Sequence, residues 1–475
     1  MPHWRRAPLA LVTGVGVVVS LAACTGEEPD DRTERSPRPL PTSYDAEPPP
    51  GVTGEPVRYL HGDGAGSPEI FDDSGGVRIE SLGDAFLVSS NSEERHVLQR
   101  ANDGETLWRG EQRVDRFGHD RDGSEVLVLA EESDGETATT VVDDEGETVW
   151  SGGGRETYLD GLALRRPDGW SAEEPHGDFT VLDTAGDEVW DFTFEEPSED
   201  AGGTEPAGED DPPEENGDTE PEPDWMGVPV GARGDVLFLD DGSGLLQARD
   251  LGEDTGELLW SVAADDEELA GRSAVPRPRP QLVGTYELPV EEDGDDTTGD
   301  GRTRDTVLVR WTLPEDPSLL SLHDLDSGEP LWSLTEPGAN PDDHDFSTER
   351  IPGTVYDPAT RTLLLPQASG ETPMIGVDLV EGEIGWEFEG VTERAITPAL
   401  ALDGYVYGDS RDSDDGSSQV VLEAESKDIV AEGLGPYVEA TTDEGYAVVV
   451  WDRQRFVFGP SDGASEDPGS SPPAE

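Results

Sequence analysis

Few side chains in this sequence belong to the types that carry out metal or thiol chemistry. A single cysteine, Cys24, excludes both an intrachain disulfide and a thiolate zinc cluster. The hydrolase turn Gly-x-Ser-x-Gly and the phosphate-binding Gly-Lys loop are absent. The sequence therefore predicts no metal and no cofactor, and it favours a noncatalytic protein. The seven histidines show no pair at metal-ligand spacing: His3, His61, His96, His119, His176, His323 and His344.

Acidic turns are the remaining feature that could hold a cation. Residues 296–301 and 412–416 each contain several carboxylates, but neither has the alternating ligand positions and the closing glutamate of a calcium loop. In a chain with 109 Asp and Glu residues, such fragments are expected by chance. We interpret both as solvated turns, with a specific calcium site as the alternative.

The overall charge excludes some classes of partner. The 475 residues include 31 Lys plus Arg against 109 Asp plus Glu, a formal net charge of −78. Nucleic-acid binding depends on basic side chains that neutralise phosphates, and the sequence has no basic stripe. An anionic membrane surface would also repel the chain. The charge thus excludes nucleic acid and direct adsorption to acidic lipid.

The N-terminus is organised as an export signal. Arg5 and Arg6 precede an apolar run at 7–23, which is shorter than the ~20 residues that a membrane-spanning helix needs. The run ends in Leu21-Ala-Ala-Cys24, which resembles the lipobox of bacterial lipoproteins. The resemblance implies that Cys24 carries a diacylglycerol and palmitate-type chains, which anchor the protein on the extracytoplasmic face of the cell membrane. An ordinary signal peptide with a chance cysteine is the alternative.

Proline and acidic residues mark the segments that should not pack, because such segments cannot bury enough apolar surface to offset their ordering entropy. Residues 195–224, for instance, hold 14 acidic residues and 6 prolines but no Lys or Arg. We predict a folded domain at 57–459. The other segments are a signal peptide at 1–24, a disordered tether at 25–56, a disordered insert at 195–224, an acidic loop at 291–305 and a disordered tail at 460–475.

One motif recurs along the folded part of the chain. A glycine, an acidic residue and, four positions after the glycine, a tryptophan occur together six times. An Asn or Asp shortly before each glycine ends a short apolar run. This order predicts a hairpin in which the acidic side chain bonds to the turn, the glycine takes the left-handed position and the next strand carries the tryptophan. The six pairs are Gly104 and Trp108, Gly146 and Trp150, Gly186 and Trp190, Gly256 and Trp260, Gly328 and Trp332, and Gly382 and Trp386, preceded by Asn102, Asp143, Asp183, Asp250, Asp324 and Asp378.

The spacing of the motif indicates a propeller. Successive tryptophans are 42, 40, 70, 72 and 54 residues apart, which approaches the ~40–50 residues of a four-stranded blade once the inserts are removed. The motif resembles the repeat of quinoprotein-like (PQQ-like) β-propellers, most closely at 254–257 and 326–329. The resemblance implies an all-β propeller in which each repeat tryptophan packs between neighbouring blades, a structural role.

Two weaker units complete the ring. Residues 420–431 form a degenerate seventh unit with Ala431 at the tryptophan position, and 446–451 with 455–458 supply two strands of an eighth. Because an open edge invites strand addition from another molecule, we expect the N- and C-terminal strands to close the ring, with 57–60 or 77–80 as the N-terminal candidate. We predict eight blades, with seven as the alternative.

These observations predict a monomeric, lipid-anchored binding or scaffolding module whose partners are other proteins or cell-envelope ligands. The alternative is a quinone-dependent dehydrogenase or a glycan-active propeller enzyme. A single cysteine cannot form the adjacent disulfide that several quinoprotein dehydrogenases use, and no acidic residue matches their catalytic positions.

Overall fold

The computed structural model describes residues 41–60, 69–72, 76–133, 136–172, 175–194, 226–252, 254–266, 269, 278–290, 302–312, 316–338, 354–367, 374–388, 396–410 and 419–461. Strands make up most of these residues, and the one helix among them is the 3-10 turn η1 (Glu69–Asp72). In the described ranges no helix is both long and apolar enough to cross a membrane.

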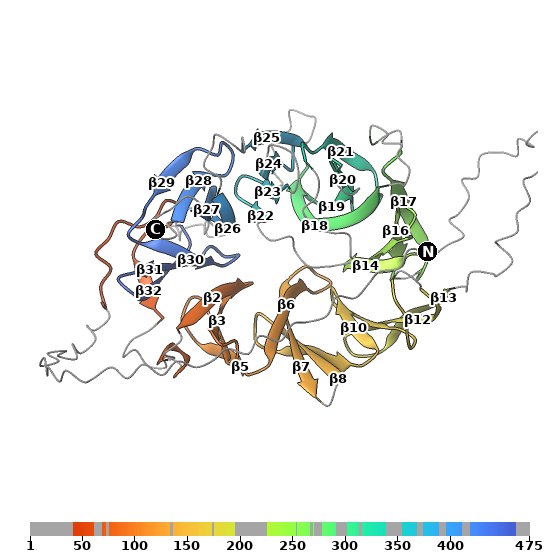
Figure 1. Ribbon diagram of the computed structural model, residues 1–475, viewed down its shortest axis with the longest axis horizontal. Helices are drawn as coiled ribbons and strands as arrows, with labels where there is room; N and C mark the ends of the chain where they lie inside the picture. The colour runs from red at the N-terminus through yellow and green to blue at the C-terminus, as the bar shows by residue number, and fades with distance from the viewer. Residues whose placement is uncertain are drawn as a thin grey trace, which may run out of the picture. The chain divides into compact units, whose positions relative to one another are not determined.

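Thirty-two strands form eight four-stranded antiparallel sheets arranged around a common axis (Figure 1). This is the predicted eight-bladed β-propeller, and the seven-bladed alternative is wrong. From the innermost to the outermost strand, blade 1 is β2 (Val77–Leu82), β3 (Ala85–Ser90), β4 (His96–Arg100) and β5 (Thr106–Gly110); blade 2 is β6 (Arg113–His119), β7 (Glu125–Ser133), β8 (Glu136–Asp143) and β9 (Thr148–Gly153); blade 3 is β10 (Glu156–Leu159), β11 (Leu162–Arg165), β12 (Gly177–Asp183) and β13 (Glu188–Phe194); blade 4 is β14 (Val228–Arg233), β15 (Val236–Asp240), β16 (Leu245–Asp250) and β17 (Leu258–Ala263). Blade 5 is β18 (Arg279–Pro289), β19 (Thr303–Thr312), β20 (Leu319–Asp324) and β21 (Pro330–Thr335); blade 6 is β22 (Val355–Asp357), β23 (Thr362–Pro366), β24 (Met374–Asp378) and β25 (Glu383–Glu387); blade 7 is β26 (Ile396–Leu402), β27 (Tyr405–Ser410), β28 (Gln419–Glu423) and β29 (Ile429–Glu432); blade 8 is β30 (Tyr437–Thr441), β31 (Ala447–Trp451), β32 (Gln454–Phe458) and β1 (Pro56–Tyr59).

The first strand of the chain closes the ring, as predicted. Strand β1 pairs antiparallel with β32, with Pro56 opposite Phe458 and Tyr59 opposite Phe456. The other candidate for closure, residues 77–80, instead begins the inner strand of blade 1. Because β1 supplies the fourth strand of blade 8, it covers the outer edge of β32.

Residues 41–55, which we name the N-terminal strap, differ from the predicted tether at 25–56. Gln454 donates from Nε2 to the carbonyl of Pro41 at 3.4 Å, and Val52 is only 7% exposed. Tyr44 packs against the aromatic side chains of blade 8. The strap can pack despite its prolines because Tyr44 and Val52 supply apolar groups and prolines have no N–H that needs a partner. Residues 41–55 therefore pack against the ring and are not a free tether.

The acidic loop predicted at 291–305 is also shorter than expected. Thr303 pairs with Pro289, and the amide of Val290 donates to the carbonyl of Arg302 at 2.9 Å. Residues 302–305 thus belong to the β18–β19 hairpin.

The core lies between the blades. Each sheet packs against a neighbour on both sides, so the second strands are buried on both faces and consist of nearly continuous apolar residues, as in Ala85–Ser90 and Val236–Asp240. The contact between blades 4 and 5 is representative, with Phe238 and Trp260 facing Val309 and Trp311.

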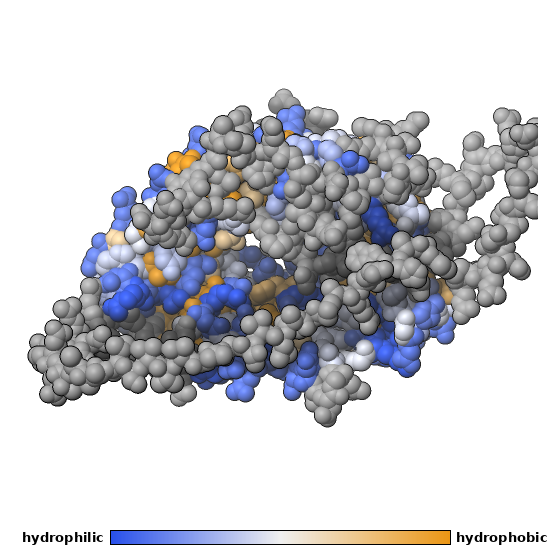
Figure 2. Space-filling view, in the orientation of Figure 1, coloured by the Kyte–Doolittle hydropathy of each residue, from blue (hydrophilic) through white to orange (hydrophobic). Residues whose placement is uncertain are grey.

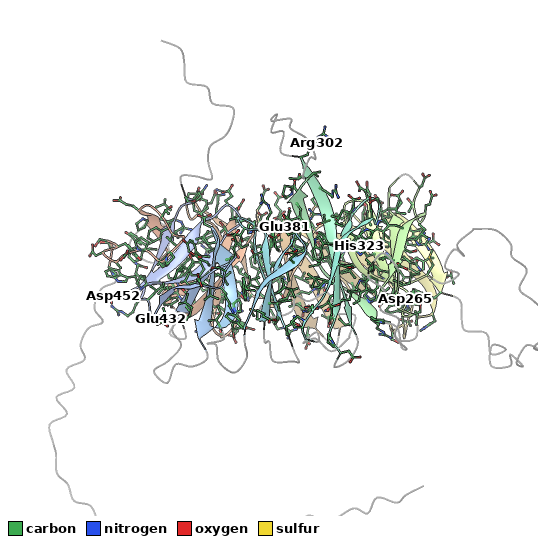
Figure 3. The ribbon with its side chains drawn as sticks, turned by 90° about the horizontal axis from the view of Figure 1, so that it is seen from above. Asp265, Arg302, His323, Glu381, Glu432 and Asp452 are labelled. Carbon is green, nitrogen blue, oxygen red and sulfur yellow. The ribbon has the colours of Figure 1, made fainter. Side chains whose placement is uncertain are left out.

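Most of the described surface in Figure 2 is hydrophilic. An apolar patch lies over β29, where Ile429 and Val430 are 49% and 40% exposed. Seen edge-on, the ring has an upper and a lower face, which carry different turns (Figure 3). Turns between the first and second strands of all eight blades, and between the third and fourth strands of blades 1–7, lie on the upper face, which carries Arg302 and Glu381. The other turns and the links between blades lie on the lower face, which carries Asp452 and Glu432.

Candidate functional site

The repeat motif forms upper-face turns with the predicted geometry. All six repeat glycines adopt positive φ angles, in the region that side chains rarely enter. A carboxylate in each turn accepts a backbone N–H, as when Asp143 accepts from the amide of Glu147 at 2.7 Å. In the first unit this acceptor is Asp103, which accepts from Glu105 at 2.9 Å, and not the predicted Asn102. The φ angles are 77° at Gly104, 84° at Gly146, 88° at Gly186, 86° at Gly256, 71° at Gly328 and 69° at Gly382.

Three repeat tryptophans donate their indole N–H to the next blade. Each acceptor is the carbonyl of the residue that directly follows the third strand of that blade. These bonds tie the outer strand of one blade to the hairpin of the next one. The pairs are Trp260 with Leu325 (2.9 Å), Trp332 with Leu379 (2.9 Å) and Trp386 with Ala424 (2.7 Å).

The glycine of the following motif gives the indole room. A Cβ atom on Gly328 would lie 2.4 Å from the ring of Trp260. The same distance is 2.3 Å for Gly382 and Trp332, and 2.6 Å for Gly256 and Trp190. Glycine is thus needed here for both its φ angle and its missing side chain.

Trp108 and Trp150 lie between blades in a different way. Each indole covers a glycine two residues further along its own strand, Gly110 or Gly152. The ring centroid of Trp150 lies 5.8 Å from that of Tyr158 in blade 3, and Trp108 packs in the cluster shared by blades 1 and 2. The other three repeat glycines have different surroundings. Gly104 lies beside Arg58 and Gly146 beside Leu107. No atom lies within 4 Å of the position that a Cβ on Gly186 would occupy.

Arg58 is a residue whose role the sequence did not reveal. It lies on β1, where its Nε donates to the carbonyl of Ala101 at 2.9 Å and its Nη2 to that of Arg100 at 3.0 Å. Ala101 directly follows the third strand of blade 1, so Arg58 donates to the same place as a repeat tryptophan. Burial lowers the pKa of Arg58 to about 10, so the side chain remains charged at neutral pH. An arginine therefore takes the tryptophan position at the seam between blades 8 and 1.

Lys427 replaces a repeat glycine in blade 7. Its φ angle is +59°, and its amide donates to the carbonyl of Glu423 at 3.0 Å, as the amide of Gly328 does to Asp324. The ammonium donates to the carbonyl of Glu387 in blade 6 at 2.6 Å. The one lysine of the chain is thus part of the blade architecture.

Carboxylates from blades 8, 1 and 2 meet on the upper face. The amide of Glu444 donates to Asp84 at 3.0 Å, and that of Gly83 donates to Glu125 at 3.1 Å. Burial, and then the charges of Glu125, Asp84 and Asp144, raise the pKa of Asp443 to about 6. These acidic groups cap backbone amides of neighbouring turns.

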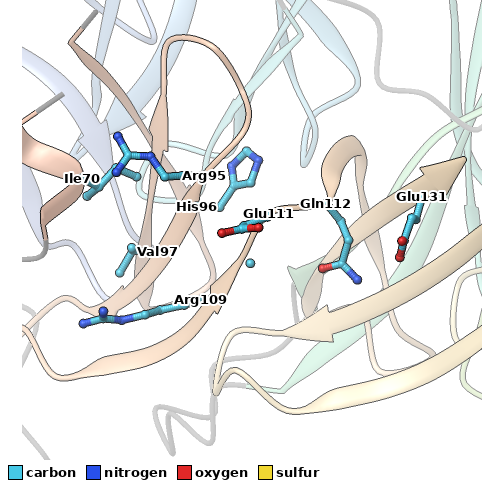
Figure 4. Close-up of a pocket in the computed structure, with 9 residues that line it drawn as sticks. Ile70, Arg95, His96, Val97, Arg109, Glu111, Gln112 and Glu131 are labelled. Atoms are coloured by element: carbon cyan, nitrogen blue, oxygen red, sulfur yellow. The ribbon is translucent and has the colours of Figure 1, made fainter. Parts of the chain in front are cut away.

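Blades 1 and 2 line an open polar cleft of about 760 Å³, named here the blade 1–2 cleft (Figure 4). Its volume is within the ~300–1,000 Å³ that is usual for ligand sites. The lining comes from η1, the β3–β4 turn, the start of β4, the end of β5, the link to blade 2 and β7. These residues are Ile70, Arg95, His96, Val97, Arg109, Gly110, Glu111, Gln112 and Glu131.

Charges in the blade 1–2 cleft are separated. Arg95 and Arg109 lie towards one end, Glu131 lies towards the other with Gln112, and Glu111 lies between them (Figure 4). Arg109 makes no hydrogen bond or ion pair with any described residue, so its guanidinium is free to meet a ligand.

His96 lines the blade 1–2 cleft but has both ring nitrogens engaged. Nε2 lies 3.1 Å from the carbonyl of Glu93, and Nδ1 lies 2.8 Å from the hydroxyl of Ser89. A carbonyl can only accept, so Nε2 carries the proton and Nδ1 accepts. Burial lowers the pKa of His96, which keeps the ring neutral.

Several predicted features fall outside the described residues: Cys24, the insert at 195–224, and the acidic turns at 296–301 and 412–416. Within the described ranges, no group of three or more His, Cys, Asp or Glu side chains is placed to hold a metal ion.

No protein-family model and no curated protein matches this sequence. Among solved structures, the chain is similar to BamB from Moraxella catarrhalis, with 14% identity over 80% of this chain and 96% of BamB and a TM-score of 0.39. It is similar to the quinohemoprotein alcohol dehydrogenase ADHIIG from Pseudomonas putida HK5, with 13% identity over 84% and 75% of the two chains and a TM-score of 0.39. For Sqt1 from Saccharomyces cerevisiae, the identity is 11% over 80% and 95%, and the TM-score is 0.39. Likenesses this distant transfer no function.

Proposed function

We propose that this chain is a lipid-anchored extracytoplasmic binding module that holds a segment of a partner protein in the blade 1–2 cleft. The observation that supports the site is the guanidinium of Arg109, which has no hydrogen-bond or ion-pair partner among the described residues, in a cleft of ligand-binding size. Such a group can form charge-assisted hydrogen bonds with a carboxylate of the partner.

The separated charges favour a polypeptide segment that carries both signs. Arg109 and Arg95 attract an acidic side chain, whereas Glu131 attracts a basic one at the other end of the cleft. A purely anionic ligand would have to approach against the field of a chain with a net charge of −78. A segment that carries both charge signs has little net charge, so this field repels it only weakly.

Photocrosslinking in intact cells tests the site. With p-benzoylphenylalanine in place of Gln112, which lines the cleft and leaves Arg109 intact, we expect a discrete covalent adduct after irradiation, detected as a band of higher mass and assigned by mass spectrometry. The matched control carries the same group at Asp122, an exposed turn residue of blade 2 on the upper face. The Glu131→Lys change in the position-112 variant should abolish the adduct. Equal adducts at positions 112 and 122, or none at either, contradict the proposed site.

Replacing Cys24 by serine tests the anchor independently. The native chain should partition into the detergent phase, whereas the Cys24→Ser protein should appear in the aqueous extracellular fraction. Stable attachment needs more than one acyl chain, which a diacylglyceryl cysteine supplies. Membrane retention of the Cys24→Ser chain equal to the native level would contradict lipid anchoring while leaving the cleft proposal intact.

A further inference from the structure

The seam between blades 7 and 8 departs from the pattern at the other seams. Blades 1–6 place a repeat tryptophan on their outer strand, and blade 8 places Arg58 there. Blade 7 has Ala431, which lies opposite Val421 in the register, as Trp386 lies opposite Gly376 in blade 6. An alanine methyl group cannot fill the volume of an indole, so this seam needs another filler.

The N-terminal strap enters this seam on the side of blade 8. The ring of Tyr44 meets three aromatic rings in edge-to-face geometry, with centroid distances of 5.7 Å to Trp451, 5.3 Å to Phe456 and 5.1 Å to Phe458. Such edge-to-face pairs stabilise the packing beyond what burial of their area gives. Burial raises the pKa of Tyr44 to about 12, so the phenol stays neutral.

The strap also contacts blade 7. The hydroxyl of Tyr407 donates to the carbonyl of Pro50. Gly51, with a φ angle of +83°, lies so close to Tyr407 that a Cβ there would be 2.8 Å from the hydroxyl oxygen. Val52 belongs to one apolar cluster with Tyr407 and the blade 8 core, and Tyr44 and Ala431 pack against the same cluster.

We propose that the N-terminal strap is a built-in ligand of the blade 7–8 seam that replaces the missing seventh tryptophan. The ring is thus closed twice, by the β1–β32 pairing and by the strap. The chain enters the ring at the β31–β32 turn, where Pro41 meets Gln454.

A double-mutant cycle in the full chain tests the strap. Tyr44→Ala should lower the Tm by roughly 3 °C, because it removes a half-buried aromatic ring. Ala431→Trp should also lower the Tm of the native chain, because the indole competes with the strap for the same space. In the Tyr44→Ala background, Ala431→Trp should instead raise the Tm. Glu47→Ala, which changes an exposed strap side chain, serves as the control and should leave the Tm unchanged.

Cleavage after Glu47 by a glutamate-specific protease reports on the strap itself. The rate should rise roughly tenfold in both Tyr44→Ala and Ala431→Trp, because both release the strap and make its backbone accessible. A purely global loss of stability would also speed cleavage after the buried Glu336, whereas release of the strap speeds cleavage after Glu47 without affecting Glu336. Additive Tm shifts in the cycle, or an unchanged cleavage rate in Ala431→Trp, overturn the proposal.

Discussion

The Trp260→Ala protein is expected to lose about 3–5 kcal/mol of unfolding free energy, the usual cost of deleting a buried tryptophan. Trp260 is 7% exposed and lies in the core shared by blades 4 and 5. The substitution leaves a cavity between blades 4 and 5, because the paired strands of each sheet keep the two sheets from closing over it. It also leaves the carbonyl of Leu325 without its 2.9 Å indole donor. Urea unfolding followed by circular dichroism measures the loss.

Leu259 provides a matched control on the same strand. It is 43% exposed, so Leu259→Ala should cost less than about 1 kcal/mol. Trp260→Phe should fall between the two, because it keeps most of the apolar volume but removes the N–H donor. Similar losses for Trp260→Ala and Leu259→Ala would show that the repeat tryptophan does not hold the blades together.

The sequence predicted the architecture well because the physical requirement repeats. A positive φ angle favours glycine in all six turns, and at Gly256, Gly328 and Gly382 a neighbouring indole also leaves no room for a Cβ, so the Gly–Trp spacing recurs from blade to blade. The recurring spacing therefore allowed the eight blades, and the closure of the ring by its terminal strands, to be predicted. Arg58 escaped prediction because it belongs to no motif and reaches its carbonyl acceptors only after the ring closes.

The N-terminal strap was missed for a different reason. Its prolines and acidic residues are typical of disordered segments, which cannot bury enough apolar surface by themselves. The strap packs because blade 7 lacks a tryptophan and leaves a groove that Tyr44 and Val52 fill. Local composition cannot show a groove formed more than 350 positions later in the chain. The blade 1–2 cleft could not be predicted from the sequence either, because the residues that line it come from turns and links of two different blades.

A buried ion pair of blade 5, at its contact with blade 6, could not be predicted from the sequence either. Arg310 on β19 donates from Nε to Glu336 at 2.6 Å and from Nη2 to its other carboxylate oxygen, and both side chains are fully buried. Gln367, after β23, donates to Glu336 at 2.6 Å and accepts from the amide of Gly338 at 3.1 Å. Arg310 also donates to the carbonyl of Pro366 at 3.2 Å. Two blades therefore share one polar network in an apolar interface.

Glu336→Ala should destabilise the protein by about 3–5 kcal/mol, because it leaves the guanidinium of Arg310 buried without a counter-charge. Glu80→Ala is the control: its partner Arg78 is half exposed, and surface pairs contribute only ~0–1 kcal/mol. The double variant Arg310→Met, Glu336→Leu separates the effect of the buried charges on stability from the effect of side-chain volume. It removes both charges and keeps most of the volume, so it should recover most of the stability lost in Glu336→Ala, as measured in the same urea titration. If the double variant were as unstable as Glu336→Ala, the cost would come from lost hydrogen bonds to the chain around Pro366 and not from an uncompensated charge.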